Sequence, residues 1–274
     1  MIPFDIDFLQ PDTIAEATTA WREATEAGRR PRWFSGGTEL VTGARERSDF
    51  DVLIDLKRIP ELTDLDLASG TIGAATRLSA LSEQADSPLV ARAAGGIADR
   101  TVRNSITIGG NVCGMLPYRE AVLPLLLFEA DATIAGPRGT HREPVTARFE
   151  KRLRLEPGEF LVSVHLPDAA RTDGFYARRT RDARVDYPLV TLCMARVDGA
   201  LRLAVSGVHG YPVRSAEAEA ALAAAGSRDR RRRAEAAADS VPDRVWDDFR
   251  AGADYRRELF VQAIENGLTA LEDA

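Results

Sequence analysis

The chain has 274 residues, a formal net charge of −6 and 45% hydrophobic residues, a globular composition that argues against a disordered chain. At roughly 150 residues per domain, this length predicts two domains. The acidic net charge disfavours binding to nucleic acid or to an acidic membrane surface. No apolar run approaches the ~20 residues of a membrane span and no signal peptide is visible, so the sequence predicts a cytoplasmic protein without a membrane span.

Helical and extended segments alternate in the first part of the chain. Apolar spacing and terminal signals predict helices over residues 12–27, 39–44, 78–84, 88–97 and 121–130. Strands are predicted over residues 51–56, 132–135 and 161–166, with a hairpin of residues 61–67 and 71–76 around a turn at 69–70.

A polar segment at residues 168–174 predicts the boundary between the two domains. Beyond it, a meander of strands is predicted near residues 174–181, 188–198 and 200–209, and helices are predicted over 215–225, 230–240 and 254–271. The interleaved strands and helices of the first part, followed by a sheet and then helices, predict an α+β protein.

A first glycine pair, Gly36-Gly37, lies in the motif Phe34-Ser35-Gly36-Gly37-Thr38-Glu39-Leu40, between an apolar segment and a helix start. Glycine permits positive φ and lets an anion come close to the backbone. Successive N–H groups at the start of a helix can also cradle a phosphate. The alternative interpretation is a plain tight turn, which this motif alone favours.

A second glycine pair lies about seventy residues later, in Thr107-Ile108-Gly109-Gly110-Asn111. The side chains of Thr107 and Asn111 can add hydrogen bonds to a ligand, and two such loops suit the two phosphates of one molecule. A branched side chain at Gly110 is expected to block that approach and to disfavour positive φ. The chain contains neither a G-x-G-x-x-G nor a P-loop pattern, so the pair is neither a Rossmann nor a P-loop phosphate site.

The chain shows no pattern for a metal site or for catalytic residues. Histidine and cysteine lack metal-ligand spacing, and no nucleophile with a neighbouring base and no G-x-S-x-G pattern occurs. Cys113 and Cys193 are the two cysteines, too few for a disulfide framework or a four-thiolate cluster. Cys113 follows the second glycine pair and either lies near a bound ligand or is a small buried residue.

Taken in chain order, these motifs resemble the FAD-binding medium subunits of molybdenum hydroxylases, the family of the flavin subunits of carbon monoxide dehydrogenase and bacterial xanthine dehydrogenase. The matching segments of the first part are Ser35-Gly-Gly-Thr-Glu-Leu, Asp51-Val-Leu-Ile-Asp-Leu, Ile59-Pro-Glu-Leu, Ile72-Gly-Ala-Ala-Thr, Ile97-Ala98, Val102-Arg-Asn and Thr107-Ile-Gly-Gly-Asn. Those of the second part are Pro157-Gly-Glu-Phe-Leu, Gly207, Pro212-Val-Arg, Asp247-Asp-Phe-Arg and Asp254-Tyr-Arg-Arg. The resemblance covers essentially the whole chain.

The resemblance implies a fold and a set of FAD-binding residues. The fold is a two-subdomain FAD-binding domain of the vanillyl-alcohol oxidase type, residues 1–168 with subdomains of about 1–57 and 58–168, followed by an antiparallel sheet packed on helices at 174–274. Glu120 stands where the family commonly has aspartate, and Arg178 where it has a flavin-contacting lysine. The implied FAD-binding residues are Phe34, Ser35, Gly36, Gly37, Thr38, Glu39, Ile97, Thr107, Ile108, Gly109, Gly110, Asn111, Glu120, Leu161, Arg178 and Tyr187.

The resemblance also implies a function. The chain is expected to pass electrons from two [2Fe–2S] clusters on a small partner subunit through FAD to NAD or another acceptor, while a large molybdopterin subunit hydroxylates the substrate. Whether this heterotrimer dimerises is left open. Two cysteines cannot supply the additional [4Fe–4S] cluster of some relatives. The alternative is a stand-alone flavin oxidase or reductase of the same fold superfamily. A flavin-free interaction module is disfavoured by the two glycine pairs.

Overall fold

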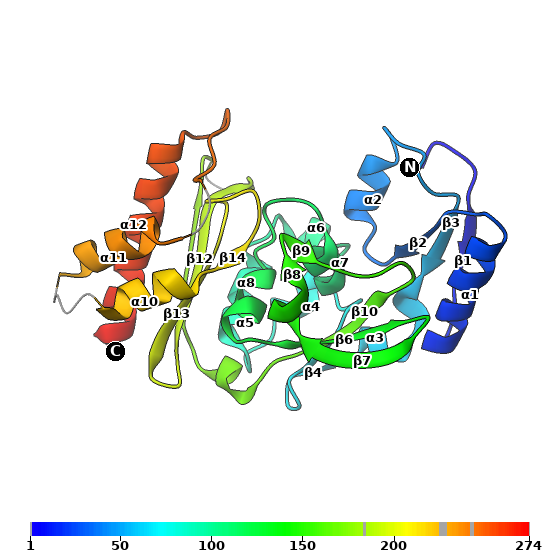
Figure 1. Ribbon diagram of the computed structural model, residues 1–274, viewed down its shortest axis with the longest axis horizontal. Coiled ribbons are helices and arrows are strands. Elements are labelled where there is room, and N and C mark those ends of the chain that lie inside the picture. Colours follow the sequence, from blue (N-terminus) through cyan, green and yellow to red (C-terminus); the bar gives the residue numbers. More distant parts are fainter. Residues whose placement is uncertain (1, 183–184, 225–228, 242–243, 274) are drawn as a thin grey trace. The chain divides into compact units, whose positions relative to one another are not determined.

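The computed structural model describes residues 2–182, 185–224, 229–241 and 244–273 (Figure 1). The chain divides into two compact units, and each is described by itself. The first compact unit comprises Met1–Ala80, Arg100–Gly114 and Ala130–Leu166, and the second comprises Leu81–Asp99, Met115–Glu129 and Pro167–Ala274. Two segments that the sequence analysis assigned to the first domain, 81–99 and 115–129, thus belong to the second compact unit, and the domain limits themselves stay a prediction.

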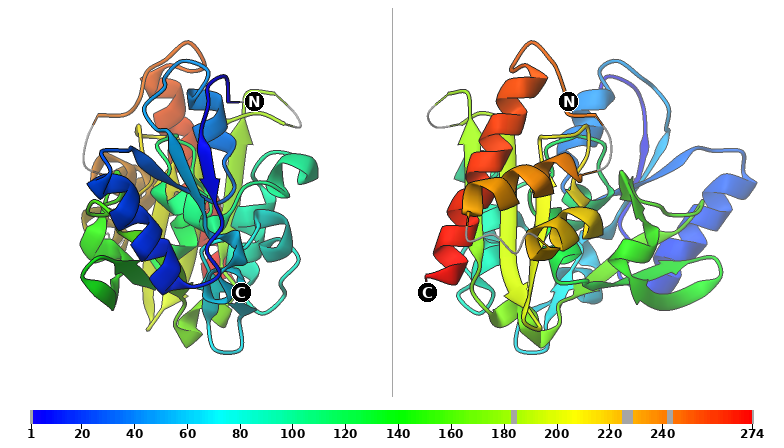
Figure 2. Two further views of the ribbon diagram at one scale, coloured as in Figure 1. Left: turned by 90° about the vertical axis from the view of Figure 1, so that its right-hand side faces the viewer. Right: turned by 60° about the vertical axis from the view of Figure 1, so that its left-hand side comes forward.

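A three-stranded parallel sheet opens the first compact unit. Its strands are β1 (Asp7–Leu9), β2 (Pro31–Phe34) and β3 (Val52–Asp55), in the order β1-β3-β2. Helix α1 (Ile14–Glu26) contacts β2 and β3 (Figure 2, left). It begins after Thr13, whose hydroxyl accepts a hydrogen bond from the backbone and so satisfies a first-turn N–H. The helix predicted over residues 12–27 is confirmed, and the observed helix starts two residues later and ends one residue earlier.

Aromatic side chains connect this parallel sheet to a second sheet. The ring of Trp21 on α1 stacks on Trp33 of β2 with 4.5 Å between centroids, and Trp33 lies 4.7 Å from Phe160. Ala17 and Ile54 are fully buried in the same cluster. These ring contacts pack α1 and β2 against Phe160, a residue of the second sheet.

The second sheet has five antiparallel strands in the order β4-β5-β10-β6-β7. The strands are β4 (Leu65–Asp66), β5 (Thr71–Gly73), β6 (Asp131–Gly136), β7 (Gly139–Pro144) and β10 (Phe160–His165). A separate two-stranded ribbon consists of β8 (Phe149–Glu150) and β9 (Arg152–Leu153). The predicted strands 132–135 and 161–166 correspond to β6 and β10.

Short helices connect these strands, and one of them corrects the sequence analysis. They are α2 (Thr38–Gly43), η1 (Leu56–Arg58), α3 (Pro60–Thr63), α4 (Leu78–Leu81), α6 (Arg100–Arg103), α7 (Ile108–Cys113) and α9 (Val145–Arg148). Residues 61–63, predicted as the start of a hairpin strand, are helical because Pro60 at the first helical position presets its backbone for a helix. The hairpin is present in a shorter form, as β4 and β5.

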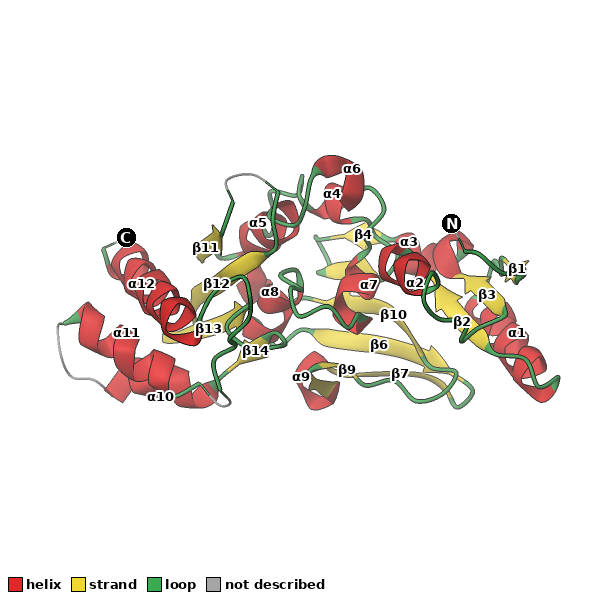
Figure 3. Ribbon diagram, turned by 90° about the horizontal axis from the view of Figure 1, so that it is seen from above, coloured by secondary structure: helices red, strands yellow, loops and turns green. Residues whose placement is uncertain are grey.

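The second compact unit is a four-stranded antiparallel sheet between two groups of helices (Figure 3). The strands, in spatial order, are β11 (Phe175–Thr180), β12 (Pro188–Val197), β13 (Ala200–Ser206) and β14 (Val213–Arg214). One group of helices is α10 (Ala216–Ala224), α11 (Arg230–Asp239) and α12 (Ala253–Glu272), and the other is α5 (Pro88–Gly95) and α8 (Val122–Leu127). The meander and the three C-terminal helices agree with the sequence analysis, except that Ala225 lies outside the described residues.

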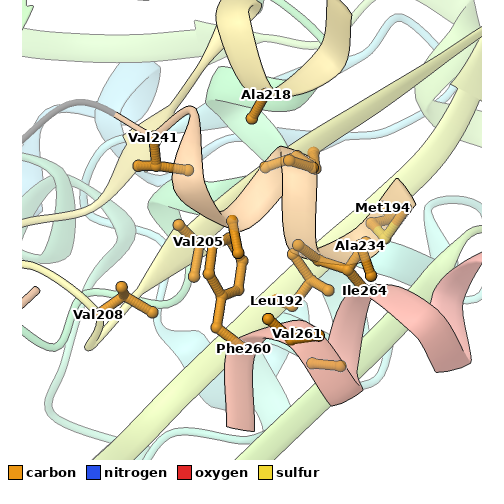
Figure 4. Close-up of a cluster of buried hydrophobic side chains, with 14 of the residues drawn as sticks. Leu192, Met194, Val205, Val208, Ala218, Ala234, Val241, Phe260, Val261 and Ile264 are labelled. Carbon is orange, nitrogen blue, oxygen red and sulfur yellow. The ribbon is translucent and has the colours of Figure 1, made fainter. Parts of the chain in front are cut away.

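The core of the second compact unit lies between its sheet and α10 to α12 (Figure 4). Leu192 and Met194 of β12 are fully buried, as are Ile264 of α12 and Ala234 of α11. Helix α12 crosses the sheet in the right-hand view of Figure 2. Among the described residues, no helix has the length and apolar character needed to cross a membrane.

Candidate functional site

The first glycine loop leaves the parallel sheet at the ends of β2 and β3. Phe34 and Asp55 are paired in the register, and because parallel strands end at the same edge, the residues after them lie close together. Ser35 to Gly37 connect β2 to α2. Gly37 has a φ of +71°, and a Cβ there would overlap the ring of Phe34. This loop therefore needs glycine at position 37 for its backbone conformation.

The second glycine pair is part of a helix rather than a loop between helices. Thr107 precedes α7, and its buried hydroxyl accepts a hydrogen bond from the Gly110 N–H at 3.1 Å. The Gly109 N–H donates to the Ala74 carbonyl at 2.8 Å, and a Cβ on Gly109 would lie 2.7 Å from that oxygen. Neither Gly109 nor Gly110 has a positive φ. The expectation of positive φ at Gly110 is wrong, because this residue lies in the first turn of α7.

The two glycine segments meet. The Ser35 hydroxyl lies 3.3 Å from the Thr107 hydroxyl, although the residues are 72 positions apart. A Cβ on Gly36 would overlap the Ser105 carbonyl oxygen and would lie 3.1 Å from the Thr107 nitrogen. The absence of a side chain at Gly36 thus allows two backbone segments to touch. The N–H groups of Ile108 to Asn111 already donate within the chain, so the second segment contributes the Thr107 hydroxyl. Backbone N–H groups of the first segment beside that hydroxyl are an arrangement suited to a diphosphate.

A buried, unsatisfied oxygen supports a ligand at this place. Asn111 is 7% exposed, and among the residues that the structure describes its Oδ1 has no hydrogen-bond partner. A buried acceptor without a donor is costly, and a ligand hydroxyl would satisfy it. The exposed Thr38 is the first residue of α2, where the helix has no preceding turn of its own to accept from the Thr38 N–H, and the exposed Glu39 follows it. The cradle and the orphaned acceptor fit the diphosphate and hydroxyl groups of a dinucleotide such as FAD.

Leu161 is connected to the second glycine segment through the backbone. It is buried in β10, where the pairing with β6 shifts register between Leu161 and Ser163. The carbonyl of the intervening Val162 accepts from the Ala74 N–H at 2.8 Å, and Ala74 in turn accepts from Gly109. Such bulges often stand beside functional sites. Ile108, also predicted to bind the cofactor, is fully buried in α7.

Lys57 belongs to this group of residues, and the sequence analysis missed it. Its Nζ donates to the Ser35 carbonyl oxygen at 3.0 Å and to Asp55 Oδ1 at 2.7 Å, and it lies 4.3 Å from the centre of the Phe34 ring. The sequence feature that could have pointed to Lys57 is the scarcity of lysine in this chain. Lys57 is one of two lysines in a chain whose other cationic side chains are arginines.

The remaining predicted residues lie in the second compact unit, where Glu120 and Arg178 form a buried pair. Arg178 Nε donates to Glu120 Oε1 at 3.2 Å, and the Glu120 side chain is 2% exposed. Burial raises the pKa of Glu120, and the neighbouring Arg178 opposes that rise. The hydroxyl of Tyr176 is buried beside them without a partner among the described residues, and burial raises its pKa as well.

Ile97 lies next to this pair. It is buried just beyond α5, and a Cβ on the preceding Gly96 would overlap the Tyr176 hydroxyl and lie 3.3 Å from Arg178 Cδ. Glycine at position 96 therefore allows the α5 terminus to approach β11 closely. The structure thus brings Ile97, Glu120 and Arg178 into one neighbourhood, which no sequence spacing indicated.

Tyr187 is half exposed, and its backbone carbonyl accepts a hydrogen bond from an arginine side chain. Its ring stacks on Tyr118 with 5.0 Å between centroids. Arg250 Nη2 donates to the Tyr187 carbonyl at 2.7 Å and to Asp186 Oδ1 at 2.6 Å, and Arg178 Nη2 donates to the Asp186 carbonyl at 2.5 Å. The Arg250 guanidinium lowers the pKa of Asp186. One face of the Tyr187 ring is thus packed, while half of the residue's surface remains exposed.

Comparison with known proteins identifies the family. Residues 4–169 match the model of the FAD binding domain in molybdopterin dehydrogenase, so the chain belongs to this family of flavin-binding domains. The chain is 28% identical over 284 residues to the carbon monoxide dehydrogenase medium chain of Hydrogenophaga pseudoflava, with 98% of each chain covered. It is 27% identical over 224 residues to the xanthine dehydrogenase FAD-binding subunit of Escherichia coli O157:H7, with 76% of this chain and 75% of that one covered.

Solved structures agree with this assignment. A carbon monoxide dehydrogenase from H. pseudoflava that lacks the Mo-pyranopterin moiety of its cofactor matches with a TM-score of 0.84 and 28% identity, covering 100% of this chain and 99% of that one. The quinoline 2-oxidoreductase of Pseudomonas putida 86 also gives a TM-score of 0.84, over 100% and 98% of the two chains. Its 20% identity shows the shared fold alone.

Proposed function

We propose that this chain is the FAD-binding electron-transfer subunit of a molybdenum hydroxylase complex. The observation that carries the proposal is the direct backbone contact between the two glycine segments at Gly36. Asn111, whose N–H donates to the Thr107 carbonyl, adds a buried oxygen without a partner among the described residues. This is the cradle expected for a dinucleotide diphosphate, in a chain whose family is defined by FAD binding.

The chain's own residues would bind and orient the cofactor. Backbone N–H groups of Gly36 to Glu39, with the hydroxyl of Thr107, would hold the diphosphate, and Asn111 Oδ1 would accept from a hydroxyl of FAD. The resemblance places Glu120, Arg178 and Tyr187 on the flavin side. Bound FAD supplies the chemistry of accepting electrons singly and releasing them as a hydride.

The finer features of the proposal follow from the family resemblance. They are the two-subdomain fold of the vanillyl-alcohol oxidase type over residues 1–168, the separate C-terminal domain over 174–274, and a heterotrimer with a small [2Fe–2S] subunit and a large molybdopterin subunit. The medium-chain names of the relatives support the partner subunits. NAD as acceptor and a cytoplasmic location remain predictions.

One anaerobic experiment tests both whether NAD is the electron acceptor and whether substrate hydroxylation is confined to a partner subunit. If NAD is the physiological acceptor, NADH should bleach the flavin absorbance of the FAD-loaded chain, because hydride transfer needs only an exposed flavin face and a nucleotide groove. Xanthine should leave the absorbance unchanged, because hydroxylation at an unactivated carbon needs a metal-oxo or comparable centre that this chain is expected to lack. Affinity purification from the native host should also recover an iron–sulfur subunit and a molybdenum subunit.

Each contrary result has a distinct meaning. Bleaching by xanthine alone would overturn the subunit proposal in favour of a stand-alone oxidoreductase. Failure of NADH to bleach the flavin would exclude NAD as the acceptor.

A further inference from the structure

We propose that Lys57 is a positioning residue that fixes the direction of the Gly36 amide in the first glycine loop and thereby sets the affinity for FAD. This inference rests on the proposed function, because it concerns the same diphosphate cradle. It assigns a role to a side chain outside both glycine motifs.

The Lys57 ammonium is held in a defined place. Asp55 is 2% exposed, and its Oδ1 accepts from the Lys57 backbone N–H at 3.1 Å and from Lys57 Nζ at 2.7 Å. Gln10 Nε2 donates to the other carboxylate oxygen at 3.1 Å. Because Asp55 ends a buried strand, this carboxylate is an anchor with little freedom, and it aims the Lys57 side chain at the first glycine loop.

Held by Asp55, Lys57 restrains the peptide unit between Ser35 and Gly36. Its Nζ donates to the Ser35 carbonyl oxygen at 3.0 Å, and that oxygen shares a planar peptide with the Gly36 nitrogen. In a trans peptide the C=O and the N–H point in opposite directions. Fixing the Ser35 carbonyl toward Lys57 therefore directs the Gly36 N–H away from it.

Glycine makes such a restraint necessary. Ser35 is followed by Gly36 and Gly37, and a glycine pair has more backbone freedom than any other. A peptide flip would turn the Ser35 carbonyl, an electron-rich group, to the side where Gly36 otherwise presents a donor. The Phe34 ring, 4.3 Å from Nζ, adds a cation–π contact that holds the ammonium over the loop. Lys57 thus opposes the conformation that would repel a diphosphate.

The choice of lysine agrees with this role. The chain uses arginine at nearly all cationic positions, with Lys57 and Lys151 as the exceptions. A compact ammonium can donate to a carboxylate and a carbonyl from one atom, whereas a guanidinium spreads its donors over a planar fork.

The test distinguishes a role of Lys57 in orienting the first glycine loop from a role in the stability of the fold alone. Lys57→Met removes the ammonium but keeps the length of the side chain, and it leaves Asp55 as a buried carboxylate. The double variant Asp55→Asn with Lys57→Met removes both charges and should recover stability in urea unfolding. Lys151→Met, at an exposed turn of the same compact unit, is the matched control. FAD binding is measured by fluorescence titration, and hydrogen exchange of the Gly36 amide is followed by NMR.

We expect FAD to bind about 10- to 100-fold more weakly to Lys57→Met, the effect of losing a hydrogen bond from a charged group. The double variant should remain equally weak although its stability recovers, and its Gly36 amide should exchange faster. Lys151→Met should bind as the wild type does. Recovery of FAD affinity together with stability, or unchanged affinity in both Lys57 variants, would overturn the inference while leaving the proposed function intact. A wild-type chain that does not bind FAD would overturn both.

Discussion

Gly36→Val is expected to lower FAD affinity by at least about 100-fold, which corresponds to about 2.7 kcal/mol. The reason is steric, since a Cβ at this position would overlap the Ser105 carbonyl oxygen and crowd the Thr107 nitrogen. Both obstacles are backbone atoms, so the two glycine segments must separate to make room. Isothermal titration with FAD measures the loss.

Two matched glycine variants control this experiment. Gly43→Ala, at the end of α2, places its Cβ 3.4 Å from the flexible end of Arg47 and should bind FAD normally. Gly110→Ala meets only the Thr107 hydroxyl at 3.2 Å and should have a smaller effect than the Gly36 change. Circular dichroism of each variant shows whether the chain is folded. A folded Gly36→Val chain with wild-type affinity would refute the assignment of the cradle.

Arg178→Met is expected to lower the free energy of unfolding by about 3–5 kcal/mol at neutral pH, the typical cost of leaving one member of a buried ion pair unpaired. Glu120 is 2% exposed and the Arg178 side chain 16% exposed, so solvent compensates little. The double variant Glu120→Gln with Arg178→Met removes the unpaired charge and should recover much of the loss. Urea unfolding monitored by circular dichroism checks both values.

The pH dependence of this loss has a defined sign. Burial raises the pKa of Glu120 above its ordinary 4.5, and removing Arg178 raises it further. The folded chain then binds the proton more tightly than the unfolded chain, so stability is lost as the pH rises through the interval between the two pKa values. The deficit of Arg178→Met should therefore shrink as the pH falls from neutral toward about 4.5. A deficit that is constant over this range would contradict burial of the ionised carboxylate.

The elements predicted well from the sequence are those whose pattern is local. Helix α1 has apolar residues at helical spacing and a threonine cap, and β10 and β12 are runs of β-branched and apolar residues. Residues 61–63 were mispredicted as strand because the apolar Leu62 suits either structure, although Pro60 before it is a local helix-start signal. The helix that begins at Pro60 buries Leu62 and pairs its carbonyl with Ala75.

The sequence predicted the two glycine motifs of the candidate site but not how their residues are arranged in space. Both glycine pairs are visible in the sequence, yet the contact between Ser35 and Thr107 depends on how two remote segments pack. The same holds for the different roles of Gly109, which has no room for a side chain, and Gly110, which has some. Lys57 carries no motif at all, because its role comes from the pairing of β2 with β3.

The central claim, that this chain binds FAD without a covalent bond, is tested most directly by heating the purified protein after incubation with FAD and removal of free flavin. The account predicts a yellow supernatant that contains one FAD per chain by absorbance and mass. Flavin that stays with the precipitate would contradict non-covalent binding and point to Cys113, the partly exposed cysteine that ends α7. A colourless protein that cannot be reconstituted would contradict the claim itself.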